Sequence, residues 1–154
     1  MKSQRAKVLF VCIGNSCRSP MAEAIARKDA SLEIEASSAG LAPLGFVADL
    51  TTQTLLTNGY PTEGLASKPI SPEAWQAADL VINMSGRPKE FAFRNLPGHI
   101  KVEDWQIDDP YGDAGKYQGT YESVRRHVAE LAQRLRKESA TRQGGGKNTA
   151  SGNL

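Results

Sequence analysis

The sequence has few cysteines and no long hydrophobic run. Its 154 residues include only two cysteines, Cys12 and Cys17, too few for the disulfide framework that stabilises small secreted domains. No apolar stretch approaches the roughly 20 residues that a membrane-spanning helix needs. The apolar segment 8–13 is too short for the core of a signal peptide, and no small-residue cleavage site follows it. We therefore expect a cytoplasmic protein with reduced thiols and no membrane contact.

The chain has no large excess of positive or negative charge, and it has only two histidines. The 19 basic and 17 acidic residues leave a net charge of +2, which is too balanced to indicate a nucleic-acid-binding surface. The two histidines, His99 and His127, lie far along the chain from both cysteines, and these four side chains do not make a zinc site. We expect neither a nucleic-acid partner nor a bound metal.

Apolar segments with β-branched residues alternate with amphipathic segments along the chain. The predicted strands are residues 7–12, 34–39, 79–84 and 100–102. The predicted helices are residues 21–29, 47–57, 71–77, 86–94 and 121–137. Strands that alternate with helices predict an α/β fold, in which helices cover both faces of a parallel sheet.

The length and the composition near the end of the chain predict one domain with a tail. A chain of 154 residues fits a single domain with a sizeable core. After residue 138 the sequence becomes rich in Gly, Ser and Asn and has almost no apolar residues. We expect residues 1–138 to form the domain and residues 139–154 to be a flexible C-terminal tail.

The segment between the first predicted strand and the first predicted helix carries the strongest functional signal. From Cys12 to Ser19 it reads CIGNSCRS. Backbone N–H groups at a helix start lack partners and the helix dipole adds positive charge, so such a loop can surround an oxyanion. Gly14 and Asn15 tolerate the unusual φ values that this shape needs. Arg18 can hold two oxygens with its guanidinium.

Cys12 lies at the floor of this predicted anion site. The positive environment favours its thiolate, the nucleophilic form, and Ser19 can donate a hydrogen bond to it. A buried cysteine at a strand end is common without any function, and a nucleotide P-loop would need G-x-x-x-x-G-K-[ST], which is absent. The complete pattern C-x-G-N-x-C-R-S-P favours catalysis, with Cys12 as nucleophile and Arg18 as phosphate clamp. The remaining loop contacts to substrate are predicted from Ile13, Gly14, Asn15, Ser16, Cys17 and Ser19.

The segment VLFVCIGNSCRSPMAEA resembles the signature of the low-molecular-weight protein tyrosine phosphatase family. Thioredoxin-coupled arsenate reductases share its fold and much of its motif. The resemblance covers most of residues 6–137 and includes Asp109-Pro110-Tyr111. It implies a four-stranded parallel sheet flanked by helices, no cofactor, and phosphomonoester hydrolysis through a phosphocysteine intermediate. Phosphotyrosine in proteins is the leading implied substrate, a small phosphomonoester is another, and we expect a monomer.

The departing alkoxide or phenolate needs a proton donor, and the later water needs a base. The resemblance implies that Asp109, directly before Pro110, serves as both. Asp108 is its main rival and Asp113 a third candidate, since Asp-Pro and Gly-Asp also occur in ordinary turns. Tyr111 is predicted to line the pocket wall.

The resemblance also implies supporting residues around the loop. Asn15 is expected to hold the loop by a hydrogen bond to Ser38, with Ser37 as the alternative partner. Many family members have a histidine near the position of Gly64; this chain has none, so its network is incomplete or built differently. Phe46 is the only aromatic residue in the loop after the second strand, and either lines the pocket or packs at the helix start.

Residue 16 bears on the substrate. Phosphotyrosine-directed members tend to have Ile there, arsenate reductases Ser and phosphoarginine-directed members Thr, whereas this chain has Ser16. No cysteine follows Cys17, which excludes a three-cysteine arsenate relay, and the resemblance implies a protective disulfide between Cys17 and Cys12. Phosphotyrosine, phosphoarginine and arsenate stay open. A module that binds phosphate without turnover is a further alternative, against which Cys12, Arg18 and Asp109 argue.

Overall fold

The structure, a computed structural model, describes residues 5–94 and 96–152. The strands are β1 (Ala6–Cys12), β2 (Ile34–Gly40), β3 (Leu80–Asn83) and β4 (Lys101–Asp104). The helices are α1 (Arg18–Asp29), α2 (Asp49–Thr57), α3 (Pro72–Ala77), α4 (Lys89–Ala92), the 3-10 turn η1 (Ala114–Lys116) and α5 (Tyr117–Gly152). Within these described ranges, no helix is both long and apolar enough to cross a membrane.

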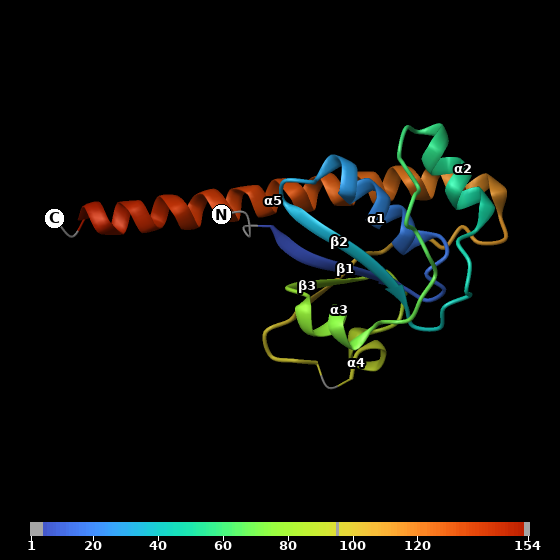
Figure 1. Cartoon of the computed structure of the whole chain (residues 1–154), viewed down its shortest axis with the longest axis horizontal. Helices are drawn as coiled ribbons and strands as arrows, with labels where there is room; N and C mark the ends of the chain where they lie inside the picture. Colours follow the sequence, from blue (N-terminus) through green and yellow to red (C-terminus); the bar gives the residue numbers. More distant parts are fainter. Residues whose placement is uncertain (1–4, 95, 153–154) are drawn as a thin grey trace.

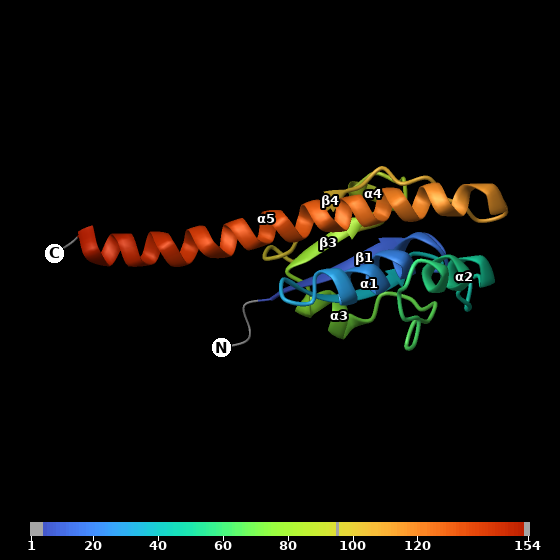
Figure 2. The same cartoon turned by 90° about the horizontal axis from the view of Figure 1, so that it is seen from above.

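The four strands form one parallel sheet in the order β2-β1-β3-β4; Figure 1 labels the first three of these strands and Figure 2 labels β4. The central strand β1 is buried from Val8 to Cys12, as its continuous apolar run predicted for a strand covered on both faces. Its last residue, Cys12, pairs with Gly40 at the carboxyl end of β2. The predicted α/β class with a four-stranded parallel sheet is therefore confirmed.

Helices cover the two faces of the sheet unequally. On one face, α1 and α5 bury Met21, Ile25, Val124 and Val128 against Phe10 of β1. On the other face, the short helix α3 and the segment around α4, which lie below the strands in Figure 1, cover a smaller cluster. The thicker layer buries the whole first half of α1, so the start of this helix is held firmly beneath the loop that precedes it.

Several element ends differ from the prediction. Helix α1 begins at Arg18 rather than at residue 21, because the Cys17 carbonyl accepts the Met21 N–H and adds a first turn. Strand β4 reaches Asp104, since its register with β3 continues to Asn83. The loop predicted over residues 104–119 instead contains η1 and the first turn of α5.

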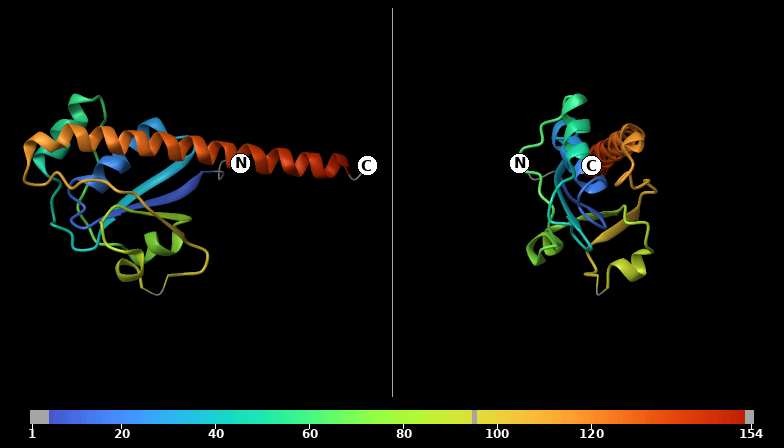
Figure 3. Two further views of the ribbon diagram at one scale, coloured as in Figure 1. Left: turned by 180° about the vertical axis from the view of Figure 1, so that it is seen from behind. Right: turned by 90° about the vertical axis from the view of Figure 1, so that its right-hand side faces the viewer.

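Helix α5 is much longer than the predicted 121–137 and runs to Gly152. It is buried against the domain as far as Ala132, and its last turns extend past the sheet (Figure 3). Side chains after residue 141 lie outside the described set. The predicted division into a domain over residues 1–138 and a flexible tail over 139–154 concerns mobility and stays a prediction.

Candidate functional site

The loop of residues 13–17, between β1 and α1, turns its carbonyl oxygens outward. Neighbouring backbone N–H groups donate to the carbonyl that precedes the loop and to three carbonyls within it: Leu41 to Cys12 (3.0 Å), Ala42 to Ile13 (2.8 Å), Leu44 to Gly14 (3.0 Å) and Ala48 to Ser16 (3.2 Å). In the part of the chain that the structure describes, none of the N–H groups from Ile13 to Ser19 donates to a protein acceptor. Unpaired N–H groups at a helix start are the donors that an oxyanion requires.

Two residues give the β1–α1 loop its shape. Asn15 has a φ of 48°, the left-handed conformation that Asn tolerates better than most residues. Gly40 lies so close to the loop that a Cβ on it would come within 2.7 Å of the Ile13 carbonyl oxygen and 3.0 Å of the Asn15 backbone nitrogen. Both contacts are with backbone, so only glycine fits there.

Cys12 sits at the floor of the loop with only 2% of its surface exposed. Its Sγ lies 3.0 Å from the Ser19 Oγ, in a position to receive a hydrogen bond from that hydroxyl. Ser19 itself is fully buried in the first turn of α1. The predicted contact between Cys12 and Ser19 forms because the end of β1 and the first turn of α1 lie next to each other.

Arg18 is buried and anchored by backbone. Its Nη1 donates to the carbonyls of Met84 (2.6 Å) and Ile107 (3.3 Å), which hold the guanidinium at the end of β3 and beside the loop after β4. Its Nε is buried and has no partner among the described residues. A buried donor without a partner is costly, and an oxyanion bound in the loop would supply the missing acceptor.

Of the three candidate acids, Asp109 alone has its carboxylate at Arg18. The Asp109 Oδ2 lies 3.5 Å from the Arg18 Nη2, and the carboxylate is half-exposed. Asp108 is exposed and contributes its backbone carbonyl to Thr120, whereas Asp113 caps η1 by accepting the Gly115 N–H. The geometry therefore favours Asp109 as the candidate acid.

The side chains at the rim are partly apolar. Tyr111 is half-exposed, and its N–H donates to the Asp109 Oδ1 at 3.1 Å. Leu44 is also exposed, and a Cβ on Gly14 would lie 3.0 Å from its Cγ, so Leu44 covers that part of the loop. Phe46 is 50% exposed and is therefore not a core residue at the start of α2.

A hydrogen-bond network behind the loop holds Asn15. Its Nδ2 donates to the Ser19 Oγ (2.7 Å) and to the Ser38 Oγ (3.0 Å). Its Oδ1 accepts the backbone N–H of Lys68 at 2.9 Å. The pairing of Asn15 with Ser38, rather than Ser37, is the arrangement expected from the sequence.

Glu23 completes this network and was missed from the sequence. It is 2% exposed, its Oε1 accepts the Ser38 hydroxyl at 2.5 Å, and its Oε2 pairs with Arg27. The i,i+4 spacing of Glu23 and Arg27 looks like an ordinary surface pair in the sequence. The network without the family's histidine is thus built differently rather than left incomplete.

Cys17 and Ser16 are both buried, and Cys17 contacts the first residue of α5. Burial raises the pKa of the Cys17 thiol, whose Sγ lies 3.3 Å from the Tyr117 hydroxyl; burial also raises the pKa of Tyr117. Ser16 is 3% exposed, and its Oγ has no partner among the residues described. Thr51 of α2 donates to the Ser16 carbonyl at 2.8 Å and so ties this helix to the loop.

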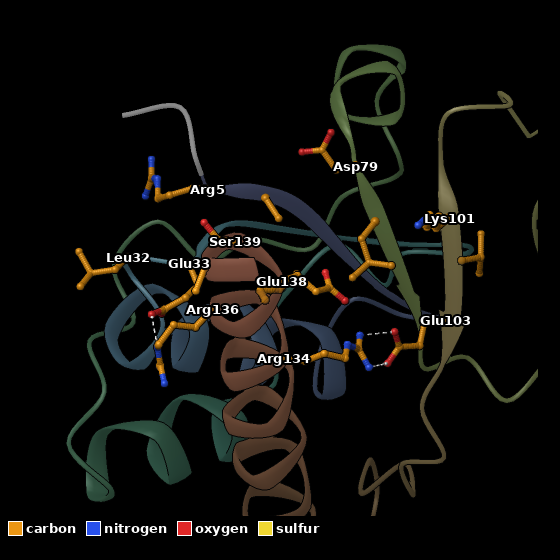
Figure 4. Close-up of a pocket in the computed structure, with 15 residues that line it drawn as sticks. Arg5, Leu32, Glu33, Asp79, Lys101, Glu103, Arg134, Arg136, Glu138 and Ser139 are labelled. Atoms are coloured by element: carbon orange, nitrogen blue, oxygen red, sulfur yellow. Dashed lines mark hydrogen bonds and ion pairs between the residues drawn. The ribbon is translucent and has the colours of Figure 1, made fainter. Parts of the chain in front are cut away.

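The remaining features lie away from the loop. A cavity of about 960 Å³ lies at the opposite edge of the sheet, between the amino ends of the strands and α5 (Figure 4). Its charged side chains are largely paired, Arg134 with Glu103 and Arg136 with Glu33. In the described ranges, no three His, Cys, Asp or Glu side chains gather as a metal site would require.

Comparison with known proteins decides the family. Residues 7–141 match the family described as low molecular weight phosphotyrosine protein phosphatase. The chain belongs to this family. It is 31% identical to an arsenate reductase of Bacillus licheniformis over 87% of the chain and 95% of the relative. It is 35% identical to the low molecular weight protein-tyrosine-phosphatase YfkJ of Bacillus subtilis over 76% of the chain and 85% of the relative.

The fold is also that of known family structures. The YwlE arginine phosphatase from Geobacillus stearothermophilus superposes with a TM-score of 0.76 at 24% identity, covering 88% of this chain and 96% of that one. The family therefore includes phosphatases and arsenate reductases, and this chain is an enzyme of that superfamily. Membership alone leaves its substrate open.

Proposed function

We propose that this chain is a cysteine-dependent phosphatase that hydrolyses phosphomonoesters, with protein phosphotyrosine as its leading substrate. The observation that supports this most is the 3.5 Å approach of the Asp109 carboxylate to Arg18. It places the carboxyl group of Asp109, the candidate proton donor, beside the guanidinium of the residue that opens α1, where the leaving group of a bound phosphate ester would lie.

In the first step, the Cys12 thiolate attacks phosphorus. The S–P bond forms as the P–O bond to the leaving group breaks, and Asp109 gives its proton to the departing oxygen. The free N–H groups from Ile13 to Ser19 and the Arg18 guanidinium stabilise the charge on the three equatorial oxygens. The products are an alcohol or phenol and a phosphocysteine.

In the second step, Asp109 acts as base. It takes a proton from a water molecule as the water oxygen attacks phosphorus, and the S–P bond breaks to release inorganic phosphate. The Ser19 hydroxyl, 3.0 Å from Cys12 Sγ, stabilises the thiolate that leaves. Asp109 ends this step protonated and is ready for the next substrate.

The rim supports an aromatic leaving group. Leu44 lies against Gly14, and Tyr111 follows the acid by two residues, so apolar surface borders the loop where a phenol ring would leave. Aromatic rings gain from packing on such side chains. The half-exposed Phe46 offers further apolar surface in the same loop as Leu44.

One observation favours phosphoarginine as a second candidate. The buried Ser16 hydroxyl has no partner among the described residues, and it stands where phosphoarginine-directed members carry Thr, which also has a hydroxyl, and arsenate reductases carry Ser. A guanidinium leaving group can donate hydrogen bonds, which a phenol ring cannot do. Arsenate reduction has less support, because Cys12 and Cys17 are the only cysteines and its electrons would come from an external thiol.

The test is turnover of peptides carrying phosphotyrosine, phosphoserine or phosphoarginine, beside arsenate with an external thiol. We expect the phosphotyrosine peptide to be hydrolysed fastest. Cys12→Ser should abolish turnover but keep phosphate binding in calorimetry, because the N–H groups of the loop remain. Faster turnover of phosphoarginine would transfer the assignment to the second candidate, and turnover by Cys12→Ser would remove Cys12 as nucleophile.

A further inference from the structure

We propose that Glu23 is a positioning residue that fixes the direction of a chain of hydrogen bonds ending on Cys12. The chain runs from Glu23 through Ser38, Asn15 and Ser19 to the thiolate, and Glu23 itself does not contact the anion site. This inference rests on the proposed role of Cys12 as nucleophile.

The first link is the bond between Ser38 and Glu23. The Glu23 carboxylate is buried, and its Oε2 pairs with Arg27. An ionised carboxylate only accepts hydrogen bonds. The Ser38 hydroxyl must therefore donate to it, across 2.5 Å, and its oxygen is left with lone pairs that face Asn15.

The second link is the amide of Asn15. The Lys68 N–H donates to its Oδ1 at 2.9 Å, and this identifies the other end of the amide as the NH₂ group. The two hydrogens of that group go to Ser38 (3.0 Å) and Ser19 (2.7 Å). The acceptor state of Ser38, set by Glu23, is thus what lets Asn15 satisfy both donors.

The last link is the Ser19 hydroxyl. Because its oxygen accepts from Asn15, its own hydrogen is free to point at the Cys12 Sγ, 3.0 Å away. The Ala39 carbonyl competes for this hydrogen from the longer distance of 3.4 Å. Each bond in the chain then has one direction, and the last one donates to the nucleophile.

Glu23→Gln should reverse the direction of the hydrogen bond between residue 23 and Ser38, while the size of the side chain stays nearly the same. The Arg27 guanidinium attracts the amide oxygen of the new side chain, which turns the NH₂ group toward Ser38. Ser38 then receives a donor where it had an acceptor, so its own hydroxyl hydrogen loses the carboxylate and competes with the Asn15 NH₂ group. Arg27 is 44% exposed at its side chain, so water can solvate it in this variant.

The experiment measures the pH dependence of Cys12 alkylation by iodoacetamide, with the modified residue identified by peptide mass spectrometry. We expect the pH of half-maximal rate to rise by about 0.5–1 pH unit in Glu23→Gln and in Ser38→Ala, as for partial loss of one hydrogen bond to a charged group. In a Ser19→Ala background, adding Glu23→Gln should cause no further rise. Thermal melting checks that each variant is folded.

Glu33→Gln is the matched control. Glu33 is also mostly buried and paired with an arginine, Arg136, but at the far edge of the sheet (Figure 4). Its alkylation profile should equal that of the wild type. A wild-type profile in folded Glu23→Gln, or additive effects of Glu23→Gln and Ser19→Ala, would overturn the proposal. Failure of the proposed function looks different: the profile shifts as expected, yet no phosphate ester is hydrolysed.

Discussion

The guanidinium of Arg18 lies 3.5 Å from the carboxylate of Asp109, although Arg18 opens α1 and Asp109 belongs to the loop after β4. Arg18 is buried and held by two backbone carbonyls, whereas the Asp109 carboxylate is half-exposed. A fixed cation therefore faces a carboxylate that solvent and substrate can reach. This asymmetry suits a clamp for phosphate and a group that exchanges protons.

Asp109→Asn should steepen the dependence of kcat/KM on the pKa of the leaving group. A poor leaving group such as phenyl phosphate needs the proton most and should lose about 10²–10⁴-fold, the range typical of general acid catalysis, whereas nitrophenyl phosphate should lose less. The measurement is a series of aryl phosphates.

Asp108→Asn is the matched control for this series. The Asp108 side chain is exposed and forms no hydrogen bond or ion pair with Arg18, so its substitution should leave the slope unchanged. If Asp108→Asn steepens the dependence on the leaving group and Asp109→Asn does not, Asp108 is the acid. A slope unchanged in both would place the donor elsewhere, with Asp113 the next residue to test.

Peroxide should inactivate the protein through a disulfide between Cys12 and Cys17, and added thiol should restore activity. Oxidation of Cys12 to sulfenic acid is followed by attack of the Cys17 sulfur, which forms the S–S bond and releases water. Burial raises the pKa of the Cys17 thiol, so at neutral pH it is protonated and the attack should become faster as the pH rises.

Mass spectrometry of peroxide-treated protein over a pH series measures this step. Cys17→Ser should instead accumulate sulfinic acid at Cys12 and fail to recover with thiol. If wild-type Cys12 also becomes sulfinic acid while Cys17 stays free, Cys17 has no protective role.

Gly40→Ala should weaken both the fold and the anion site. The new Cβ would meet the Ile13 carbonyl at 2.7 Å, so the loop must move. We expect a loss of about 1–3 kcal/mol in the free energy of unfolding, as for overpacked cores, with weaker phosphate binding. Gly98→Ala is the control, since a Cβ there meets nothing within 4 Å. Equal stability of the two variants in urea would contradict the crowded approach at Gly40.

Deletion of residues 139–154 should leave kcat/KM and the melting temperature nearly unchanged. The packed face of α5 ends near Leu135, and the deleted segment has almost no apolar residues to bury. Turnover of an aryl phosphate and calorimetric melting of the truncated chain measure the effect. A large drop in either would mean that this segment packs or binds.

The parts of the site that depend on residues adjacent in the sequence were predictable. The run from Val8 to Cys12 predicts a buried strand, and the eight residues from Cys12 to Ser19 predict the loop, because both depend on local sequence. The choice of Ser38 over Ser37 as the partner of Asn15 came from the family resemblance. Asp109 could be selected over Asp108 only by a motif, since neither spacing nor composition places a loop residue beside Arg18.

Other features depend on contacts that no local pattern encodes. Glu23 and Arg27 have the spacing of a surface pair, and only the packing of α1 beneath β2 buries the glutamate. The contact of Cys17 with Tyr117 joins the two ends of the domain, and the residues before the predicted start of α5 have weak helical periodicity. The start of α5 at Tyr117 and the contact of Tyr117 with Cys17 were therefore not predictable.

The outward carbonyls of the β1–α1 loop tie the anion site to the segment of residues 41–48, which joins β2 to α2. The site can exist only after these distant parts have assembled, so phosphate should bind the native state and not the unfolded chain. Such a ligand raises the free energy of unfolding by RT ln(1 + [L]/Kd), about 2.7 kcal/mol at one hundred times Kd. Phosphate, which the protein does not consume, should therefore stabilise the folded domain. The rise in melting temperature with phosphate concentration measures the affinity of the site for phosphate, even in a variant that cannot hydrolyse substrate.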